Sequence, residues 1–392
     1  MKRNKDLKKE LELYIHIPFC VRKCAYCDFL SGPADDRTIE HYVEKMIEEI
    51  GAYGNCDSFS DTMVTTVFLG GGTPSILSGS QMGRIMDSVR ANFNIVEGAE
   101  ISMEANPGTV TKEKLTLYLQ AGINRISFGL QSTNNEELKL LGRIHTYEEF
   151  LESYGLAREC GYENINVDLI SAIPGQTLES WEESIRKVLT LEPEHISAYS
   201  LIIEEGTPFF ETYGEGAEGE HLLPSEEDER EMYRRTEELL EEAGYHRYEI
   251  SNYAKAGREC RHNLGYWERK NYLGIGLGAS SLIDNVRYKN TDELSKYLMY
   301  SGDLEKIQED KEVLSETEQM EEFVFLGLRK MEGVSIQEFE ETFGKTLEEC
   351  YGENIHRLQN EKLLILEEGY LKLTKKGIDI SNYVFAEILY EE

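Results

Sequence analysis

The stretch Tyr14-Ile15-His16-Ile17-Pro18-Phe19-Cys20-Val21-Arg22-Lys23-Cys24-Ala25-Tyr26-Cys27 contains three cysteines in a C-x3-C-x2-C run. Residues 11–17 read as a buried strand, so the cysteines fall in the loop that follows it. Three thiolates this close in sequence can hold three corners of a [4Fe–4S] cube and leave the fourth iron open. Structural zinc is the alternative. It normally takes four ligands from two pairs of Cys or His residues, and the chain has no second pair of this kind. The spacing therefore favours an iron–sulfur cluster on Cys20, Cys24 and Cys27.

The remaining four cysteines are scattered along the chain, and the total of seven is odd. A disulfide framework does not have this pattern, so the cysteines indicate a reducing compartment. No apolar run approaches the roughly 18 residues of a membrane span, and the start of the chain does not read as a signal peptide. We therefore expect a soluble, cytoplasmic protein.

Apolar runs alternate with amphipathic helical patterns through the first half of the 392 residues. Strands are predicted at 11–17, 64–69, 100–105, 125–129, 164–170 and 195–201, with helices between them. Six β/α units indicate a parallel sheet with right-handed crossovers, either doubly wound or an incomplete barrel. We favour an incomplete (β/α)6 barrel of the α/β class, because candidate ligand residues recur after successive strands.

The second half predicts a smaller unit. A segment rich in Gly and Glu ends at Ser225, a good N-cap for a helix to about residue 243. We place one domain at residues 1–245 and a smaller α+β domain at 246–392. Near its end two helices (335–343, 347–361) precede a hairpin (363–366, 370–373), an order typical of a winged helix.

Charge argues against a nucleic-acid partner. The chain has 41 basic and 74 acidic residues, a net charge of −33, and residues 335–392 alone carry −7. A polyanion of this kind is repelled by phosphate backbones. The winged-helix pattern therefore does not predict DNA binding here.

A strand, then CxxxCxxC with an aromatic residue before the last cysteine, then six β/α units resembles the radical S-adenosylmethionine (radical SAM) superfamily. The flanking residues 14–20 narrow the resemblance to the branch that contains oxygen-independent coproporphyrinogen III oxidase and the HemW-type heme chaperones. It extends over nearly the whole chain. It implies a [4Fe–4S] cluster whose open iron chelates S-adenosylmethionine, and an electron donor that allows cleavage to a 5′-deoxyadenosyl radical.

The run Gly70-Gly71-Gly72-Thr73-Pro74 follows the second strand, whereas an ordinary tight turn needs only one glycine. By resemblance this loop lines the methionine end of S-adenosylmethionine, which makes Gly71, Gly72 and Thr73 binding residues. The resemblance also assigns to S-adenosylmethionine or substrate-side contacts Tyr14, Glu104, Gln131, Arg143 and Asp168, with Tyr26 as a stacking aromatic residue. Asp168 is a charge inside an apolar strand, which is costly unless it is paired.

A second glycine run, Gly274-Ile275-Gly276-Leu277-Gly278, invites a dinucleotide interpretation. Its spacing is not GxGxxG, and no βαβ context with a later acidic residue is evident. We therefore do not predict a nicotinamide or flavin site.

Two features depart from the oxidase pattern. The oxidase carries a further cysteine two residues after the third, where this chain has Phe29, and a longer segment before the barrel, where this chain has 13 residues before Tyr14. A third feature, His262-Asn263-Leu264-Gly265-Tyr266-Trp267, has the HNxxYW form of the heme chaperones. A neutral imidazole can ligate heme iron and aromatic rings can flank a macrocycle, so His262, Tyr266 and Trp267 are candidate heme contacts.

The resemblance predicts a heme chaperone that passes heme to an acceptor protein and carries a [4Fe–4S] cluster with exchangeable S-adenosylmethionine. Oxygen-independent coproporphyrinogen III oxidase, which decarboxylates propionates oxidatively, is the alternative. Whether the chain is an enzyme stays open, with no oxidase activity expected. The expected partners are heme, an unnamed acceptor and an electron donor, with a peripheral contact to membrane hemoproteins and no nucleic acid.

Overall fold

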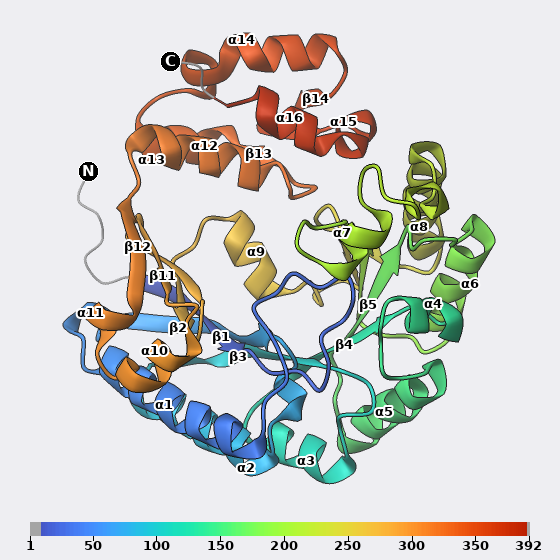
Figure 1. Cartoon of the computed structure of the whole chain (residues 1–392). Coiled ribbons are helices and arrows are strands. Elements are labelled where there is room, and N and C mark those ends of the chain that lie inside the picture. The colour runs from blue at the N-terminus through green and yellow to red at the C-terminus, as the bar shows by residue number, and fades with distance from the viewer. Residues whose placement is uncertain (1–8, 390–392) are drawn as a thin grey trace.

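A computed structural model describes residues 9–389. Its centre is a run of parallel strands that pair in chain order and curve around a common interior (Figure 1). This confirms the predicted incomplete barrel. The six strands are β1 (Lys9–Ile17), β2 (Thr62–Gly71), β3 (Ile95–Ala105), β4 (Arg125–Gln131), β5 (Ile165–Ser171) and β6 (His195–Ser200).

Helices between these strands form an arc on the outside of the sheet (Figure 1). Each buries one apolar stripe, as Trp181, Ile185 and Val188 do on α6, because the sheet behind it is apolar on that face. The helices are α1 (Asp36–Gly54), α2 (Gly79–Asn92), α3 (Lys112–Gln120), α4 (Asn135–Leu140), α5 (Tyr147–Cys160) and α6 (Leu178–Leu189), with short 3₁₀ turns η1 (Asp57–Phe59) and η2 (Pro74–Ile76).

The sheet does not end with the barrel strands. Beside β1 it continues through β9 (Tyr272–Ile275), β10 (Ser280–Ile283), β11 (Val286–Asn290) and β12 (Gln308–Val313), and beside β6 through β8 (Asn252–Ala254) and β7 (His246–Arg247). Strand β9 is parallel to β1, whereas β8 is antiparallel to β6. These strands were not predicted from the sequence. Because one sheet spans the predicted boundary at residue 245, the division into 1–245 and 246–392 stays a prediction.

Further helices lie in the chain between β6 and the last segment. They are α7 (Pro208–Tyr213), η3 (Glu220–Leu222), α8 (Glu226–Glu242), α9 (Arg261–Trp267), α10 (Leu294–Tyr300) and α11 (Leu304–Ile307). Ser225 caps α8 as predicted, accepting a hydrogen bond from the amide of Asp228. Helix α9, which contains the HNxxYW motif, lies between the barrel strands and the C-terminal helices (Figure 1).

The last segment has its own hydrophobic core, built from residues between Met320 and Ile388. Its order is helix, strand, two helices and a hairpin, as in a winged helix. The hairpin turns at Glu368 and Gly369, both with positive φ, which suits a tight two-residue turn. The elements are α12 (Glu316–Gly327), β13 (Val334–Ser335), α13 (Ile336–Phe343), α14 (Leu347–Asn360), β14 (Leu364–Glu367), β15 (Tyr370–Leu373), α15 (Lys375–Asp379) and α16 (Ser381–Glu387).

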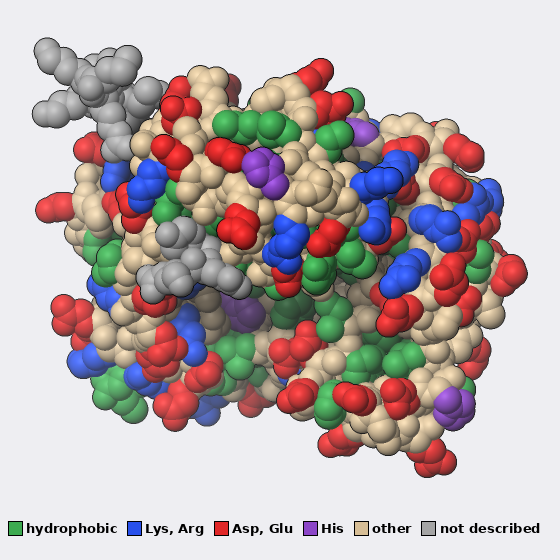
Figure 2. Space-filling view, turned by 90° about the horizontal axis from the view of Figure 1, so that it is seen from above, with side chains coloured by type: hydrophobic (Ala, Val, Ile, Leu, Met, Phe, Trp, Pro, Cys, Tyr) green, Lys and Arg blue, Asp and Glu red, His purple; other side chains and the backbone are tan. Residues whose placement is uncertain are grey.

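Charged side chains cover the outside of the molecule. Figure 2 shows acidic and basic side chains over the face seen from above, with Lys and Arg grouped toward the right of the view. Among residues 9–389 no helix is both long and apolar enough to cross a membrane.

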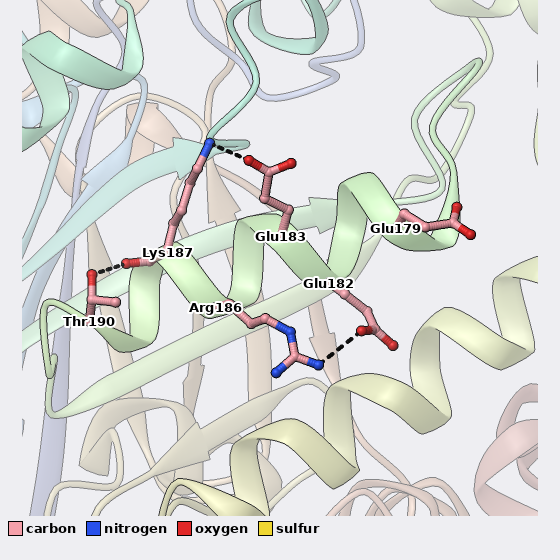
Figure 3. A pocket seen from close by; sticks show the side chains of 6 residues that line it. All are labelled: Glu179, Glu182, Glu183, Arg186, Lys187 and Thr190. Atoms are coloured by element: carbon pink, nitrogen blue, oxygen red, sulfur yellow. Dashed lines mark hydrogen bonds and ion pairs between the residues drawn. The ribbon is translucent and has the colours of Figure 1, made fainter.

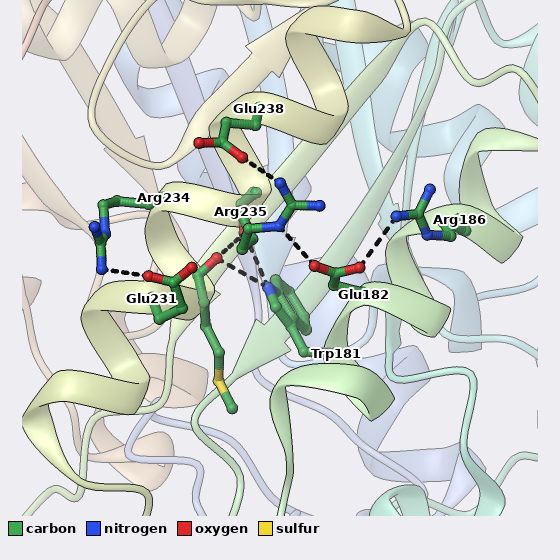
Figure 4. A network of polar contacts seen from close by, with 9 residues as sticks. Trp181, Glu182, Arg186, Glu231, Arg234, Arg235 and Glu238 are labelled. Carbon is green, nitrogen blue, oxygen red and sulfur yellow. Dashed lines mark hydrogen bonds and ion pairs between the residues drawn. The ribbon is translucent and has the colours of Figure 1, made fainter.

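A hollow of about 370 Å³ lies on the outer face of α6 and is lined by residues of that helix and its C-cap, from Glu179 to Thr190 (Figure 3). Next to it Arg235 of α8 pairs with Glu182 at 2.6 Å, and the indole of Trp181 donates to Thr236 at 2.9 Å (Figure 4). These contacts fasten α8 to α6. The hollow is thus part of a solvated helix face and lies apart from the loops that follow the strands.

Candidate functional site

The cysteine loop leaves the C-terminal end of β1 and returns to it before α1 begins. The amide of Cys20 donates to the Gly32 carbonyl and the amide of Gly32 donates to the Pro18 carbonyl, both at 3.0 Å. The Ala25 amide also donates to the Leu141 carbonyl at 3.1 Å. The loop is therefore closed at its base and tied at its middle to the segment after α4.

The three cysteines of the run are free thiols and are half-buried. The Thr73 hydroxyl donates to Cys20 Sγ at 3.3 Å, and Arg143 Nη1 donates to Cys24 Sγ at 3.5 Å. Burial raises the pKa of Cys27. Cysteine binds metal as the thiolate, and the hydroxyl and guanidinium groups beside Cys20 and Cys24 are hydrogen-bond donors that a metal-bound sulfur can accept from.

In the part of the chain that the structure describes, no three His, Cys, Asp or Glu side chains converge as the ligands of a single ion do. A cubane does not need such convergence, because each thiolate binds its own iron. Three free thiols on one loop, with hydrogen-bond donors at two of them, fit a cluster with one open iron.

The first glycine run packs directly against the start of the cysteine loop. The Gly72 amide donates to the Ile17 carbonyl and the Thr73 amide to the Phe19 carbonyl, both at 2.8 Å. A Cβ on Gly72 would lie 2.7 Å from the Phe19 carbonyl oxygen, and Gly71, at φ +106°, faces the His16 ring with no room for one. Close packing alone thus requires glycine here, so contact with S-adenosylmethionine stays a prediction.

His16 is a site residue that sequence reasoning did not single out. Its Nδ1 is 2.9 Å from the Tyr14 hydroxyl and its Nε2 is 3.0 Å from the Leu30 carbonyl oxygen. Burial lowers the pKa of His16. A neutral ring that donates from Nε2 accepts from Tyr14 at Nδ1. Tyr14 and His16 are two residues apart in a strand, so their side chains lie on the same face, and this spacing could have identified His16 from the sequence.

Two carboxyl groups face the barrel interior from neighbouring parts of the sheet. Glu104 accepts from the backbone amide of Gly71 at 3.0 Å, and Asp168 accepts from the Ser127 hydroxyl at 2.8 Å and from Asn166 Nδ2 at 2.7 Å. Burial, aided by the nearby Asp168 charge, raises the pKa of Glu104 to about 8. Burial also raises the pKa of Asp168, although hydrogen bonds from Ser127 and Asn166 oppose that rise. A cation placed between the two carboxyl groups would favour their ionised forms.

Arg143 lies between the cysteine loop and the ends of β3 and β4. Its Nη2 donates to Asn106 Oδ1 and to the Gly129 carbonyl, both at 2.6 Å, while Nη1 faces Cys24. Gln131 ends β4 at φ +72°, beside a register shift in the pairing of β4 with β5. A non-glycine residue in this region is uncommon and marks a constrained strand end.

Tyr26 and the candidate heme contacts lie in two different parts of the structure, the first beside the cysteine loop and the others in α9. Tyr26 packs edge-on against Phe209 with ring centroids 6.3 Å apart, beside the cysteine loop. His262 is only 1% exposed, with Nδ1 2.7 Å from the Thr66 hydroxyl and Nε2 3.1 Å from the Tyr266 hydroxyl. Trp267 instead lies under the guanidinium of Arg329, 4.4 Å from its ring centroid. In this arrangement both ring nitrogens of His262 are engaged, and its role as a heme ligand stays a prediction.

Sequence reasoning also missed a set of buried polar groups nearer the strand starts. Glu12 is 1% exposed, and burial raises its pKa to about 8. Arg125 is buried beside Glu100, and its Nε has no hydrogen-bond partner. A single polar residue inside an apolar strand indicates a buried polar group, but the sequence does not show which of these groups are in contact with one another.

Comparison with known proteins agrees with this geometry. The radical SAM superfamily model matches residues 14–188, and the HemN C-terminal domain model matches residues 314–380. Heme chaperone HemW of Lactococcus lactis is 38% identical over 98% of this chain and 99% of its own, and that of Bacillus subtilis is 38% identical over 96% and 99%. The structure of coproporphyrinogen III oxidase (HemN) from Escherichia coli superposes with a TM-score of 0.84 at 23% identity, over 97% of this chain and 90% of that one.

The barrel with its cysteine loop thus defines a radical SAM protein. Within that class the chain belongs to the HemW heme chaperone family, since the relatives match along nearly their whole length. The similarity to the oxidase structure shows the fold alone.

The raised pKa of Glu104 predicts a pH-dependent stability. Between the ordinary glutamate pKa near 4.5 and about 8 the folded protein binds one more proton at this site than the unfolded chain does. The free energy of unfolding therefore falls as pH rises through this window, by up to about 1.4 kcal/mol per pH unit. Glu104→Gln keeps an acceptor for the Gly71 amide and cannot ionise. Urea unfolding of the cluster-free protein from pH 5 to 8 should show a shallower decline in the variant, and an unchanged slope would contradict the assignment.

Proposed function

We propose that this protein is a heme chaperone that binds a [4Fe–4S] cluster, S-adenosylmethionine and heme, and transfers the heme to an acceptor protein. The observation that carries the proposal is the cysteine loop, which presents three thiols, with Phe29 at the place of the oxidase's additional cysteine. The Phe29 side chain is 67% exposed, so it is not a core residue that merely replaced a thiol. The family membership supports the same function.

In this proposal Cys20, Cys24 and Cys27 hold the cluster. A cluster with one open iron supplies the site at which S-adenosylmethionine is bound and reduced. Thr73 and Arg143 donate to two of the sulfurs, and hydrogen bonds to cluster sulfurs help to set the reduction potential. Val21 and Phe29 of the cysteine loop are apolar residues that are exposed to solvent.

We propose that S-adenosylmethionine occupies the strand ends around this loop. Residues 71–73 border the cysteine loop, and Glu104 and Asp168 are buried carboxyl groups whose ionised forms a cationic sulfonium would favour. Gln131 ends β4 and Tyr14 lies near the end of β1, whereas Tyr26 is in the cysteine loop and Arg143 follows α4. The hydrogen bond from Arg143 to Cys24 Sγ and that from the Gly71 amide to Glu104 support the assignment.

For heme we retain His262 as the proposed axial ligand, with Tyr266 and Trp267 as neighbours. Ligation requires that the imidazole release either Thr66 or Tyr266, because each ring nitrogen is engaged. The neutral state that ligation needs is already favoured, since burial lowers the pKa of His262 to about 3. We therefore infer that α9 shifts when heme binds.

The second candidate is coproporphyrinogen III oxidase activity, which the shared fold favours. Anaerobic incubation with coproporphyrinogen, S-adenosylmethionine and a reductant tests it, and we expect unchanged substrate. We further propose that the protein is cytoplasmic and that an electron donor reduces its cluster. The heme acceptor would be reached by peripheral contact with membrane hemoproteins.

The cluster ligands can be tested by substitution. Cys20→Ala, Cys24→Ala and Cys27→Ala should each abolish the broad visible absorbance of the anaerobically reconstituted protein, because a cubane lacking one of three protein ligands is not retained. Cys56→Ala is the matched control, since Cys56 is also half-buried and donates only to the Ala52 carbonyl. Iron loss in the control, or retention in any of the three, would show that the ligand set is wrong.

Heme binding should saturate at one heme per chain in an anaerobic titration followed by absorbance. We expect His262→Ala to weaken binding and His41→Ala, at an exposed position on α1, to leave it unchanged. Tyr266→Phe should tighten binding, because it keeps the ring and removes the hydroxyl that holds Nε2.

Each result of this titration has a separate meaning. Binding that is equal in the wild type and His262→Ala moves the ligand elsewhere and keeps the chaperone. Absence of saturable binding to the cluster-loaded wild type overturns the chaperone proposal.

A further inference from the structure

The second glycine run, which does not fit a dinucleotide motif, lies against the cysteine loop. It begins within β9 and continues into the turn after that strand, and the parallel pairing of β9 with β1 places Ile275 opposite Ile15. We propose that residues 274–278, together with Tyr42 of α1, are positioning elements that hold both ends of the cysteine loop in the geometry a cluster requires. This inference rests on the proposed cluster but concerns residues outside its ligand set.

Tyr42 links the glycine run to the beginning of the cysteine loop. Its hydroxyl donates to the His16 carbonyl at 2.9 Å and accepts from the Leu277 amide at 2.8 Å. The side chain has no exposed surface, and its ring meets Phe19 edge-on with centroids 5.1 Å apart. One hydroxyl thus satisfies two buried backbone groups that have no water to replace it.

The glycines are required by the approach of the two loops. Gly276 has φ +103°, and a Cβ there would lie 2.7 Å from both the His16 carbonyl oxygen and the Tyr42 hydroxyl. Gly278 has φ +65°, and its Cβ would lie 2.5 Å from the Leu30 side chain. His16 stands before the cysteines and Leu30 after them, so the run contacts both ends of the loop.

The glycine run is also hydrogen-bonded to a buried carboxyl group, that of Glu49. Glu49 of α1 accepts from the Gly276 amide at 2.9 Å, from Asn290 Nδ2 at 2.6 Å and from the Tyr297 hydroxyl at 2.6 Å. These donors come from the loop after β9, from β11 and from α10. Residues far beyond the barrel in sequence therefore form a rigid support under the cysteine loop.

The support can be tested with a substitution that preserves packing. Tyr42→Phe leaves the ring in place and removes the hydroxyl, so the His16 carbonyl and the Leu277 amide lose their partner. In the anaerobically reconstituted protein we expect iron to pass to a chelator roughly tenfold faster than in the wild type, since the loop is less restrained. The EPR spectrum of the reduced cluster should also change, a readout that general destabilisation does not move.

Tyr245→Phe is the matched control. Tyr245 is also buried, and its hydroxyl donates to a backbone carbonyl, that of Pro193, before β6 and away from the cysteine loop. It should lower the free energy of unfolding without altering iron release or the EPR spectrum. Gly276→Ala is a second variant, expected to release iron faster than Tyr42→Phe, with circular dichroism as the check that it has folded.

Each outcome separates this inference from the proposed function. If the wild type forms no cluster, the proposed function fails. If the wild type forms a cluster and Tyr42→Phe and folded Gly276→Ala both release iron at the wild-type rate, the positioning role is overturned while the cluster stands. Equal acceleration in Tyr245→Phe would also overturn it, because the effect would then be one of global stability.

Discussion

The site depends on the parallel pairing of β1 with strands on both of its sides. On one side Ile17 lies opposite Gly71 of β2, and on the other Ile15 lies opposite Ile275 of β9. Parallel strands end at the same edge, so a glycine run leaves the sheet on each side of the cysteine loop. On the β2 side the loop is held by the backbone of residues 72–73, and on the β9 side it meets the second glycine run through the Tyr42 hydroxyl and the Leu30 side chain. A change of register in β1 would break both sets of contacts.

The barrel interior can be polar because its polar side chains are paired by hydrogen bonds. The outer face of each strand packs on helices and is apolar, whereas the inner face carries Glu104, Asp168 and other polar groups that are held by hydrogen bonds. Burial raises the pKa of both carboxyl groups, so their protonation responds to whatever charge enters the interior. A cation between them would favour the ionised forms and be favoured by them in turn.

The sequence predicted the barrel well because each buried parallel strand is a continuous apolar run and each outer helix is amphipathic. Strands β7 to β12 escaped prediction because most of them are short, and because β9 and β8 join the sheet by pairing with β1 and β6, which lie far away in sequence. The cysteine and first glycine loops could be placed beside each other because both follow neighbouring strands. His16, Tyr42 and Glu49 could not, because their roles arise from contacts with residues about 14 to more than 200 positions away.

The burial of α9 sets an energetic condition on any heme role for its histidine. His262 stacks on Phe68 at a centroid distance of 5.2 Å and shares both nitrogens with hydroxyl groups. Breaking one such bond costs about 1 kcal/mol when the freed groups find no partner at once, which lowers the population of the competent state several-fold. Apparent heme affinity falls by the same factor. A weaker affinity of this kind would help a chaperone to release heme. A histidine that regains its buried hydrogen bonds when heme leaves gives heme up more readily than one that would be left without partners.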